Sequence, residues 1–317
     1  MNILITGITG LFGSYLAAEF ASIGKIFGIR RTDSSTRLLD QKNLEISWRE
    51  ADLRDSSQLE SALEDIDLVI HAAGMVSFSP SDSDQLYQTN VIGTRNLVNA
   101  MLEKDTKQLI HISSVAAIGR STEITTINEN FKWTESPLHT NYARSKYEGE
   151  LEVWRGEQEG LEVLIVNPSV ILGKIADERS STSIYDYVLE EKSYYPKGDI
   201  NYIDARDAAE LTRLLFEKGT WGERYILNAG SIPFQEFFSV MADSFDKKAP
   251  QKPVTPLLLN LAVWYAGFAR WIGVSKIPLN RSTARLSQLA VHFDNSKIRK
   301  AVDFEFRPLS DTFNWAK

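Results

Sequence analysis

The chain of 317 residues contains no cysteine, which excludes disulfides, thiol nucleophiles and Cys-ligated zinc. Its four histidines, His71, His111, His139 and His292, are far apart in the sequence and lack metal-ligand spacing, so we expect no metal site. The net charge is −7, and no block of like charges occurs. This balance disfavours nucleic acid or an anionic membrane as the main partner.

Long apolar runs are also missing. The longest covers residues 257–269 and is too short for a membrane span, so we expect no stable membrane insertion. No basic segment with a following apolar run opens the chain, which favours a cytoplasmic protein. Within residues 257–274, Trp264, Phe268 and Trp271 share one helical face. We expect this face to pack within the protein, as core or as a lid, or at the interface of a homodimer, and the alternative is a face that rests on a membrane surface.

What the sequence does contain is an alternation of short apolar runs and amphipathic stretches. Strands are expected over residues 2–6, 26–30, 47–51, 68–71, 108–113 and 162–167. Helices are expected between them, over residues 11–21, 56–63, 90–103 and 142–158. Such alternation predicts the α/β class, with right-handed βαβ units forming a Rossmann-type, doubly wound parallel sheet.

The alternation of expected strands and helices becomes less regular after Pro168, and residues 180–183 and 194–201 are interpreted as loops. Residues 224–228 form a short apolar run that we expect to rejoin the main sheet. The prediction is a dinucleotide-binding domain over residues 1–168, to which residues 200–230 return. A smaller, mostly helical substrate lobe would comprise residues 169–199 and 231–317, at the edge where open α/β sheets bind ligands.

A glycine-rich turn directly follows the first expected strand. Gly7, Gly10 and Gly13 have the spacing Gly-x-x-Gly-x-x-Gly and lead into the first helix. Bare backbone permits a tight turn and close approach of a pyrophosphate, and the helix N-terminus supplies N–H donors. This turn therefore predicts a dinucleotide site, with contacts from Gly7, Thr9, Gly10, Leu11, Phe12 and Gly13.

The ends of the next strands refine this prediction. Arg30 and Arg31 end the second strand, where an acidic residue would bind the ribose of NAD and an arginine accommodates the 2′-phosphate of NADP. The sequence therefore favours NADP, with NAD as the alternative. Asp52 and Leu53 after the third strand are candidates for the adenine, and the small residues Ala72, Ala73 and Gly74 after the fourth for the ribose and nicotinamide.

Tyr142 and Lys146 are four residues apart, on one face of an expected helix. An ammonium group near a phenol favours the phenolate, which would help tyrosine to act as an acid and base at a carbonyl oxygen. Ser114 follows the fifth expected strand, where its hydroxyl could donate to the same oxygen.

Together these motifs resemble the extended short-chain dehydrogenases/reductases, the NAD(P)-dependent epimerase/dehydratase group. The likeness is greatest to the branch of dihydroflavonol reductases and 3β-hydroxysteroid dehydrogenases. It rests on eight motifs in family order, at residues 5–13, 51–55, 71–74, 89–94, 112–119, 142–146, 167–173 and 202–207.

The resemblance implies that Ser114, Tyr142 and Lys146 are catalytic, with Ser113 as a structural neighbour and Asn90 as a structural residue. Tyr142 and Lys146 would also contact the cofactor, as would Asn167, Pro168 and Ser169 beside the nicotinamide. Val115 and Ala116 stand where sugar-nucleotide dehydratases carry an Asp-Glu pair, which disfavours water elimination. The candidates for an apolar substrate pocket are Met75, Val76, Phe78, Val115, Ala116 and Ile118.

The leading hypothesis is reversible reduction of a carbonyl group on a small, hydrophobic substrate. One alternative is a nucleotide-sugar epimerase with tightly bound NAD, for which Arg270, Arg281 and Arg285 are available as anion-binding residues. Another is a non-catalytic sensor of NADP(H), a type of protein that tends to lose the tyrosine or the lysine.

Overall fold

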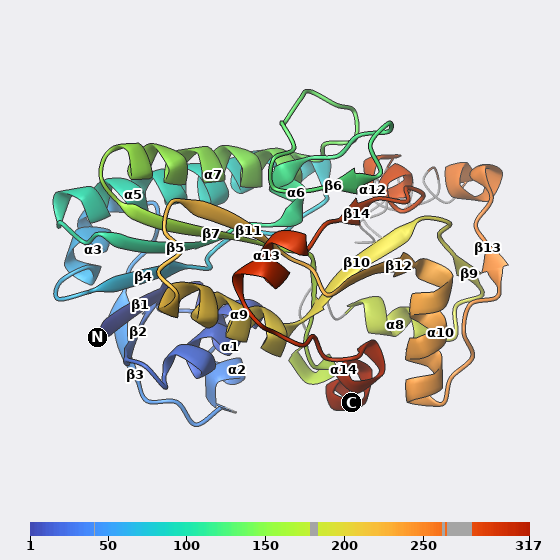
Figure 1. Ribbon diagram of the computed structural model, residues 1–317, viewed down its shortest axis with the longest axis horizontal. Helices are drawn as coiled ribbons and strands as arrows, with labels where there is room; N and C mark the ends of the chain where they lie inside the picture. The colour runs from blue at the N-terminus through green and yellow to red at the C-terminus, as the bar shows by residue number, and fades with distance from the viewer. Residues whose placement is uncertain (41, 178–182, 262–263, 265–280) are drawn as a thin grey trace.

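A seven-stranded parallel sheet forms the centre of the larger part of the molecule. The computed structural model describes residues 1–40, 42–177, 183–261, 264 and 281–317. The strands lie in the order β11-β7-β5-β4-β1-β2-β3 (Figure 1). Their bounds are β1 Asn2–Thr6, β2 Lys25–Arg30, β3 Ile46–Glu50, β4 Leu68–His71, β5 Gln108–Ile112, β7 Glu162–Pro168 and β11 Glu223–Leu227. The doubly wound sheet predicted from the sequence is confirmed, and residues 224–228 do rejoin it through β11 beside β7.

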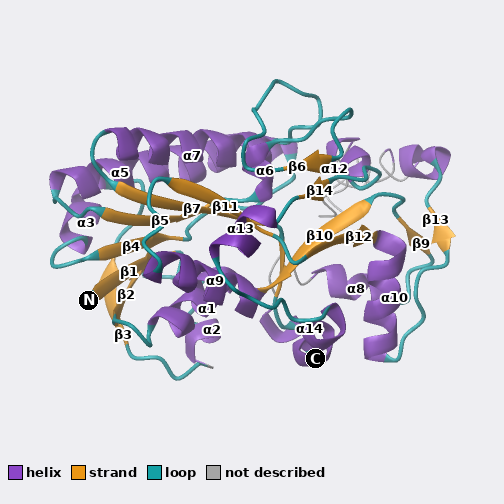
Figure 2. Ribbon diagram, in the orientation of Figure 1, coloured by secondary structure: helices purple, strands orange, loops and turns teal. Residues whose placement is uncertain are grey.

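Helices cover both faces of this sheet (Figures 1 and 2). α1 (Leu11–Phe20), α2 (Arg37–Asp40) and α9 (Ala205–Glu217) lie on one face, and α3 (Ser56–Ala62), α5 (Gly93–Glu103) and α7 (Asn141–Gln158) lie on the other. Because helices cover both faces of the sheet, successive residues of a strand are apolar, which explains the continuous apolar runs in the sequence. In β1, Ile3 and Ile5 pack on the α1 side while Leu4 packs on the α5 side. The strand order reverses between β1 and β4, which places a ligand crevice at their carboxyl ends.

Short elements connect the sheet to this crevice. After β4 come the 3₁₀ turn η1 (Pro80–Asp82), helix α4 (Ser83–Tyr87) and the π-helical turn η2 (Gln88–Ile92), which leads into α5. The helix expected from Asn90 therefore begins as a π turn. After β5 come α6 (Val115–Ile118) and the short strand β6 (Thr126–Ile127).

The smaller lobe combines short strands with helices (Figure 2). Strands β8 (Val170–Leu172), β10 (Asp199–Asp204) and β12 (Gly230–Pro233) form a three-stranded sheet. β9 (Tyr194–Tyr195) pairs with β13 (Lys252–Pro253), and β14 (His292–Phe293) pairs with β6. Its helical elements are η3 Ile175–Asp177, α8 Ser183–Leu189, α10 Phe234–Phe245, α12 Arg281–Leu286, α13 Ser296–Ala301 and α14 Leu309–Ala316. Tyr185, Phe237 and Phe313 are fully buried in its core.

One expectation for this lobe is wrong. Residues 194–201 are not a loop, because β9 begins at Tyr194 and β10 begins at Asp199. Asp199 pairs with Pro233 and Tyr194 with Lys252. These partners are 34 and 58 residues away in the sequence, so local composition carries no trace of the pairing. Most of the aromatic stretch at residues 257–274, including Phe268 and Trp271, and most of the expected loop at residues 180–183 lie outside the described residues.

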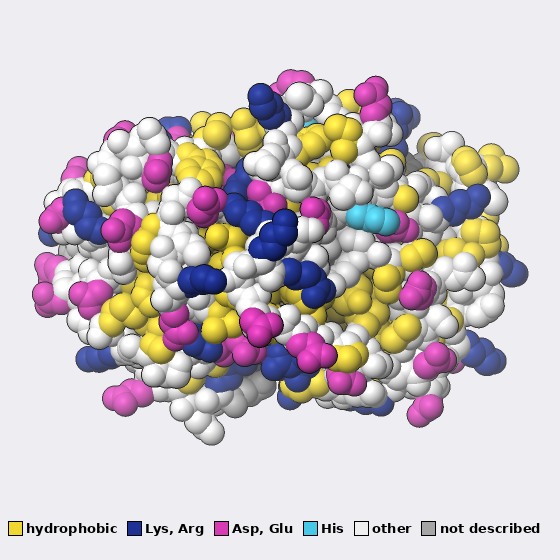
Figure 3. All heavy atoms as spheres, viewed as in Figure 1, with side chains coloured by type: hydrophobic (Ala, Val, Ile, Leu, Met, Phe, Trp, Pro, Cys, Tyr) yellow, Lys and Arg dark blue, Asp and Glu magenta, His cyan; other side chains and the backbone are white. Residues whose placement is uncertain are grey.

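The surface shows no concentration of one charge on the face seen in Figure 3, where basic and acidic side chains alternate. Among the helices that the structure describes, none has the length and apolar character needed to cross a membrane.

Candidate active site

The glycine turn lies at the carboxyl end of β1, in the crevice where the strand order reverses. Gly7 has φ +65°, and an added Cβ would lie 2.5 Å from the Ala73 Cα. At Gly13 an added Cβ would lie 2.2 Å from the Gly7 carbonyl oxygen. Within the described part of the chain no side chain caps α1, whose N-cap residue is Gly10. The first N–H groups of α1 are therefore available to an anionic ligand.

Arg30, the last residue of β2, lies over an aromatic ring. Its Cζ is 4.6 Å from the centre of the Trp48 ring, and no described carboxylate forms an ion pair with it. Arg31 is largely exposed and lies 3.7 Å from Asp33. The cation–π contact with the indole holds the Arg30 guanidinium near the end of β2, where no described carboxylate pairs with it.

Asp52, the expected adenine contact, already has a partner. Its carboxylate accepts hydrogen bonds from the Arg54 Nε at 3.0 Å, Nη2 at 2.7 Å and backbone N–H at 2.9 Å. The side-chain hydrogen bond from Arg54 lowers the pKa of Asp52 to about 2. Leu53 lies against Gly93, where an added Cβ would come within 3.1 Å of the leucine Cβ. An adenine at this position would meet a carboxylate that is charged and partly occupied.

A directed chain of hydrogen bonds runs beneath residues 72–74. The Ala73 N–H donates to the Thr6 hydroxyl at 3.2 Å, and this hydroxyl bonds the His71 Nδ1 at 2.7 Å. The His71 Nε2 bonds the Thr94 hydroxyl at 2.9 Å, and Thr94 donates to the Asn90 carbonyl. This order of donors requires neutral His71 with its proton on Nε2. Burial, helped by the charge of Lys146, lowers the pKa of His71 to about 3, which is consistent with that assignment.

Asn90 holds the loop after β4 in place. Its side chain accepts from the Met75 N–H at 2.7 Å and donates to the Met75 carbonyl at 3.0 Å and the Ser145 hydroxyl at 2.9 Å. Gly74 lies between this residue and α7, since an added Cβ would be 3.4 Å from Asn90 Oδ1 and 3.8 Å from Lys146 Nζ. These contacts join the β4 loop to α7, as expected of a structural residue.

Ser114, Tyr142 and Lys146 come together at the carboxyl edge of the sheet. Ser114 caps α6, its hydroxyl accepting from the Ala116 N–H at 3.2 Å. Tyr142 lies in the first turn of α7, whose N-cap is Thr140. Lys146 lies one turn further along α7, buried, with its Nζ donating to the Ile112 carbonyl at 2.9 Å.

The ionisation of these groups reflects burial. Burial raises the pKa of Tyr142, while the Ser114 hydrogen bond and the charge of Arg120 act in the opposite direction. Burial lowers the pKa of Lys146 to about 8, against the effect of the Glu150 carboxylate. Tyr142 is therefore a protonated acid at neutral pH, and Lys146 is a cation that can lose its proton in mildly alkaline solution.

Beneath the lysine lies a buried carboxylate that the sequence reasoning missed. Glu150 is 2% exposed and accepts from the Ser113 hydroxyl at 2.7 Å, the Asn167 Nδ2 at 2.9 Å and the Arg224 Nη1 at 3.0 Å. It lies one helical turn beyond Lys146, so the spacing of residues 142, 146 and 150 could have revealed it. This cluster connects α7 to β5, β7 and β11.

The turn at residues 167–169 belongs to the same cluster. Asn167 also donates to the Ser114 carbonyl at 3.0 Å, while its buried Oδ1 has no hydrogen-bond partner among the described residues. The backbone N–H of Ser169 donates to the Leu227 carbonyl at 3.0 Å, which ties the turn to β11. Pro168 is the last residue of β7 and is buried. The Asn167 Oδ1 is thus an acceptor for which the described residues supply no donor.

The expected pocket residues divide into two groups. Phe78 packs edge-on against Tyr142, with ring centres 5.7 Å apart, and Val76 beside it is exposed. Val115, Ala116 and Ile118 are buried, and Val115 and Ile118 pack in an apolar cluster with Phe293. The loop after β4 therefore brings apolar surface to Tyr142, whereas Val115 and Ile118 mainly support the site from behind.

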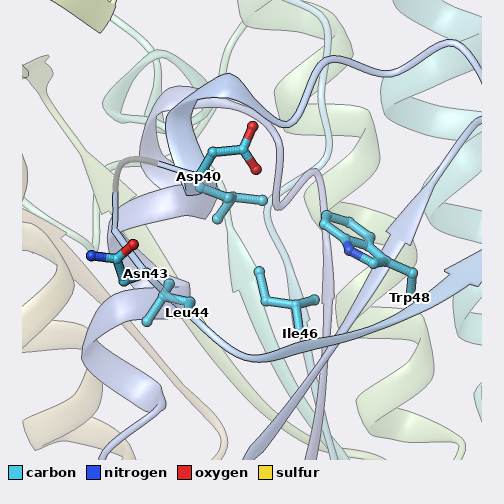
Figure 4. A pocket seen from close by; sticks show the side chains of 6 residues that line it. Asp40, Asn43, Leu44, Ile46 and Trp48 are labelled. Carbon is cyan, nitrogen blue, oxygen red and sulfur yellow. The ribbon is translucent and has the colours of Figure 1, made fainter.

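Two surface hollows are separate from this arrangement. One of about 330 Å³ lies between α2 and β3 and is lined by Leu39, Asp40, Asn43, Leu44, Ile46 and Trp48 (Figure 4). Another of about 350 Å³ lies behind α6, between residues 129–133, Tyr147 and Arg224. Ser114, Tyr142 and Lys146 line neither hollow. Of the arginines considered for a nucleotide-sugar ligand, Arg281 and Arg285 are exposed on α12, and Arg270 lies outside the described residues.

Comparison with known proteins places these features in context. A family model described as the NAD dependent epimerase/dehydratase family matches residues 3–230. Sterol demethylase protein B of Methylococcus capsulatus is 29% identical over 266 residues, which cover 82% of this chain and 79% of that protein. Cinnamoyl-CoA reductase 1 of Petunia hybrida is 24% identical over 272 residues, which cover 80% and 78%. The crystal structure of gox2253 has a TM-score of 0.84 and 27% identity, and the match covers 99% of this chain and 96% of that one.

Proposed function

The chain belongs to the NAD-dependent epimerase/dehydratase family, within the extended short-chain dehydrogenases/reductases, and from this we propose that it reversibly reduces a carbonyl group with NADP(H). The observation that carries the proposal is that Ser114, at the start of α6, and Tyr142, in the first turn of α7, meet at the carboxyl edge of the sheet, with buried Lys146 one helical turn from Tyr142. Two hydroxyl donors beside one cation suit a carbonyl oxygen that becomes an alcohol.

The residues around the crevice fit a nicotinamide dinucleotide. An added Cβ would fill the space at Gly7 and Gly13, and α1 presents its uncapped N-terminus to the same place. We propose that Gly7, Thr9, Gly10, Leu11, Phe12 and Gly13 hold the pyrophosphate and that Arg30, with Arg31, faces the 2′-phosphate. Asp52, Leu53, residues 72–74 and residues 167–169 would line the remainder of the cofactor. When bound, the reduced nicotinamide supplies the hydride.

The protein's own groups supply the proton. The raised pKa of Tyr142 keeps the phenol protonated at neutral pH, so it can donate to the carbonyl oxygen as the alcohol forms. Ser114 would turn its hydroxyl from Tyr142 to the same oxygen and stabilise the developing negative charge. Lys146 holds a positive charge one turn away, fixed by the Ile112 carbonyl, and favours the phenolate that remains.

The substrate would lie between the β4 loop and the smaller lobe, the part built around the β8, β10 and β12 sheet. Met75, Val76 and Phe78 follow β4, and the Phe78 ring already touches Tyr142. We propose that these side chains contact an apolar part of the substrate. The Asp-Glu pair of the dehydratases is absent at Val115 and Ala116, so the residues favour reduction over water elimination.

The first test is the cofactor preference. The purified protein is expected to oxidise NADPH in the presence of hydrophobic aldehydes and ketones, with a Kd for NADPH at least about tenfold below that for NADH. Arg30→Ala should remove this preference by weakening NADPH binding about 10- to 100-fold, because a charged hydrogen-bonded contact to the phosphate is lost. Fluorescence titration of both cofactors measures the effect.

The matched control is Arg49→Ala on the neighbouring strand. Arg49 also stacks on an aromatic ring, with its Cζ 4.5 Å from the centre of Phe27, but on the opposite face of the sheet. Its removal should leave both dissociation constants unchanged. A parent protein that binds NADH more tightly, or that is purified with NAD retained, would contradict the proposal and favour the epimerase.

A second test uses pH. Because Lys146 has a pKa of about 8, its ammonium form is present below that pH and is lost above it. The kcat/KM for carbonyl reduction should therefore be level below pH 8 and fall as the pH rises further. Glu150 raises the pKa of Lys146, so Glu150→Gln should move the falling limb to lower pH.

Glu148→Gln is the control for this shift, since residue 148 points away from residues 146 and 150 on the same helix. Its profile should match that of the parent. Thermal unfolding establishes which pH range leaves each variant folded, because Glu150 also pairs with Arg224. A folded Glu150→Gln protein with an unmoved limb would show that Lys146 is not the titrating group.

A further inference from the structure

An arginine that no motif singles out lies against the segment that leads into α7. Arg120 follows Gly119, whose φ of +104° turns the chain after α6. An added Cβ at Gly119 would be 3.3 Å from His139, Phe131 and Trp133, so this turn is closely packed. The Arg120 N–H donates to His139 Nε2 at 3.4 Å. His139 precedes Tyr142 by three residues, which brings the Arg120 backbone against the start of α7.

The Arg120 side chain extends toward the smaller lobe. Its Cζ is 5.8 Å from the centre of the Phe293 ring, which belongs to β14. β14 pairs with β6 and also contacts β10, through the Asn201 carboxamide that accepts from the Phe293 N–H at 3.0 Å. The guanidinium thus lies where the β5–α7 connection meets the lobe proposed to hold the substrate.

Most of the partly buried arginines have an acceptor for the guanidinium. Those that pair with a carboxylate are Arg95, Arg155, Arg206, Arg213, Arg224 and Arg307. Arg49 donates to the Ala62 carbonyl, and Arg30, which no described carboxylate pairs with, is the arginine proposed for the cofactor phosphate. Arg120 is also only partly exposed, yet within the described residues no carboxylate lies within ion-pair distance of it and no acceptor bonds its side chain. A guanidinium removed from water without an anion is unfavourable, so such a group is expected where an anionic ligand completes it.

We propose that Arg120 binds an anionic group, a carboxylate or a phosphate, on the carbonyl substrate. The inference rests on the proposed function and adds a substrate class to it: carbonyl compounds that carry an anion at one end. The planar fork of the guanidinium matches two oxygens of such a group. Because the Arg120 guanidinium lies over the Phe293 ring and its backbone is bonded to His139, three residues before Tyr142, the anion would be held at a set distance from the reacting carbonyl.

The charge of Arg120 is already felt at Tyr142, where it acts against burial and lowers the pKa of the phenol. Burial lowers the pKa of Arg120 to about 10, so it remains charged at neutral pH. If stabilising the phenolate were the sole role of Arg120, its removal would slow the reduction of every substrate equally. Binding a substrate anion instead predicts a loss confined to anionic substrates.

The experiment compares carbonyl acids with their neutral methyl esters. The probes are 4-oxobutanoate, 3-carboxybenzaldehyde and 4-carboxybenzaldehyde, which place the carboxylate at different distances, together with 4-formylphenyl phosphate against benzaldehyde. With NADPH, at least one acid should exceed its ester in kcat/KM by about tenfold or more, the effect of one charged hydrogen-bonded contact. Arg120→Gln should reduce this ratio to about one and change the ester by less than about threefold.

Arg144→Gln is the matched control. Arg144 lies in the same turn of α7 as Tyr142, but its side chain is exposed and pairs with Glu135 at 2.9 Å. It should leave the acid-to-ester ratio unchanged. A parent protein that never prefers the acid, or an Arg120→Gln protein that loses acid and ester activity equally, overturns the inference.

A binding measurement separates this inference from the proposed function. In a Tyr142→Phe background with NADP⁺, 4-(hydroxymethyl)benzoate should bind about tenfold more tightly than its methyl ester, and Arg120→Gln should abolish the difference. If this difference appears but no carbonyl compound is reduced by the parent, the reductase proposal fails while Arg120 remains an anion site. Equal binding of acid and ester in the presence of Arg120 rejects the anion site.

Discussion

Tyr142→Phe is expected to lower kcat for carbonyl reduction about 10²- to 10⁴-fold, the usual contribution of a positioned general acid. The substitution keeps the ring and its edge-on contact with Phe78 and removes only the phenolic hydroxyl. Because the backbone and the glycine turn are untouched, Kd for NADPH should stay within about threefold of the parent value. Steady-state kinetics and fluorescence titration give the two quantities.

Tyr147→Phe is the control, on the same helix. Tyr147 stacks on Trp133 with ring centres 4.3 Å apart, and its substitution also removes one phenolic hydroxyl. It should leave kcat unchanged. Equal turnover by the Tyr142→Phe protein and the parent on a true substrate would show that another group donates the proton.

Gly7→Ala is expected to destabilise the protein by about 2–5 kcal/mol and to weaken NADPH binding by at least about tenfold. Adopting φ of +65° costs an L-residue about 1–2 kcal/mol, and forcing a methyl group into a packed site costs about 1–3 kcal/mol more. The added Cβ would lie 2.5 Å from the Ala73 Cα, so the β1 turn or the β4 loop must move. Both lie in the proposed cofactor site, and urea unfolding without cofactor measures the loss of stability.

Gly219→Ala separates the conformational cost of a positive φ from the packing cost of the added methyl group. Gly219 has φ +68°, almost the same as Gly7, but nothing lies within 4 Å of its added Cβ. Its substitution should cost only about 1–2 kcal/mol, the conformational term, and leave NADPH binding unchanged. Equal destabilisation by the two substitutions would mean that the contact with Ala73 is relieved without cost.

Much of the fold could be predicted because its signals are local. The strands β1, β2, β4 and β5 begin and end within one residue of the expected bounds, since each is a short apolar run between turn residues. The Gly7–Gly13 spacing identifies the turn because a φ of +65° and a 2.2 Å approach both exclude a side chain there. Tyr142 and Lys146 were recognisable because their spacing is that of one helical turn.

Other features depend on residues that only the fold brings together. β9 pairs with residues 58 positions away in the sequence and β10 with residues 34 positions away, so residues 194–201 carry no strand signal of their own. Glu150 is a catalytic-site neighbour because β5, β7 and β11 surround it with Ser113, Asn167 and Arg224. The Asp52 carboxylate was assigned to an adenine from its position alone, whereas its neighbour Arg54 already binds it.

The sequence by itself predicted the parallel sheet, the glycine turn and the candidate pair Tyr142 and Lys146, because each is encoded by periodicity or spacing within a few residues, and the resemblance to the family added Ser114 to this candidate set. Tertiary structure alone decided the protonation and partners of that set. Burial raises the pKa of Tyr142 and lowers that of Lys146, and burial is a property of the packed chain. The same packing leaves Arg120, between His139 and Phe293, without a carboxylate among the described residues, since charge pairing depends on which distant residues share a site.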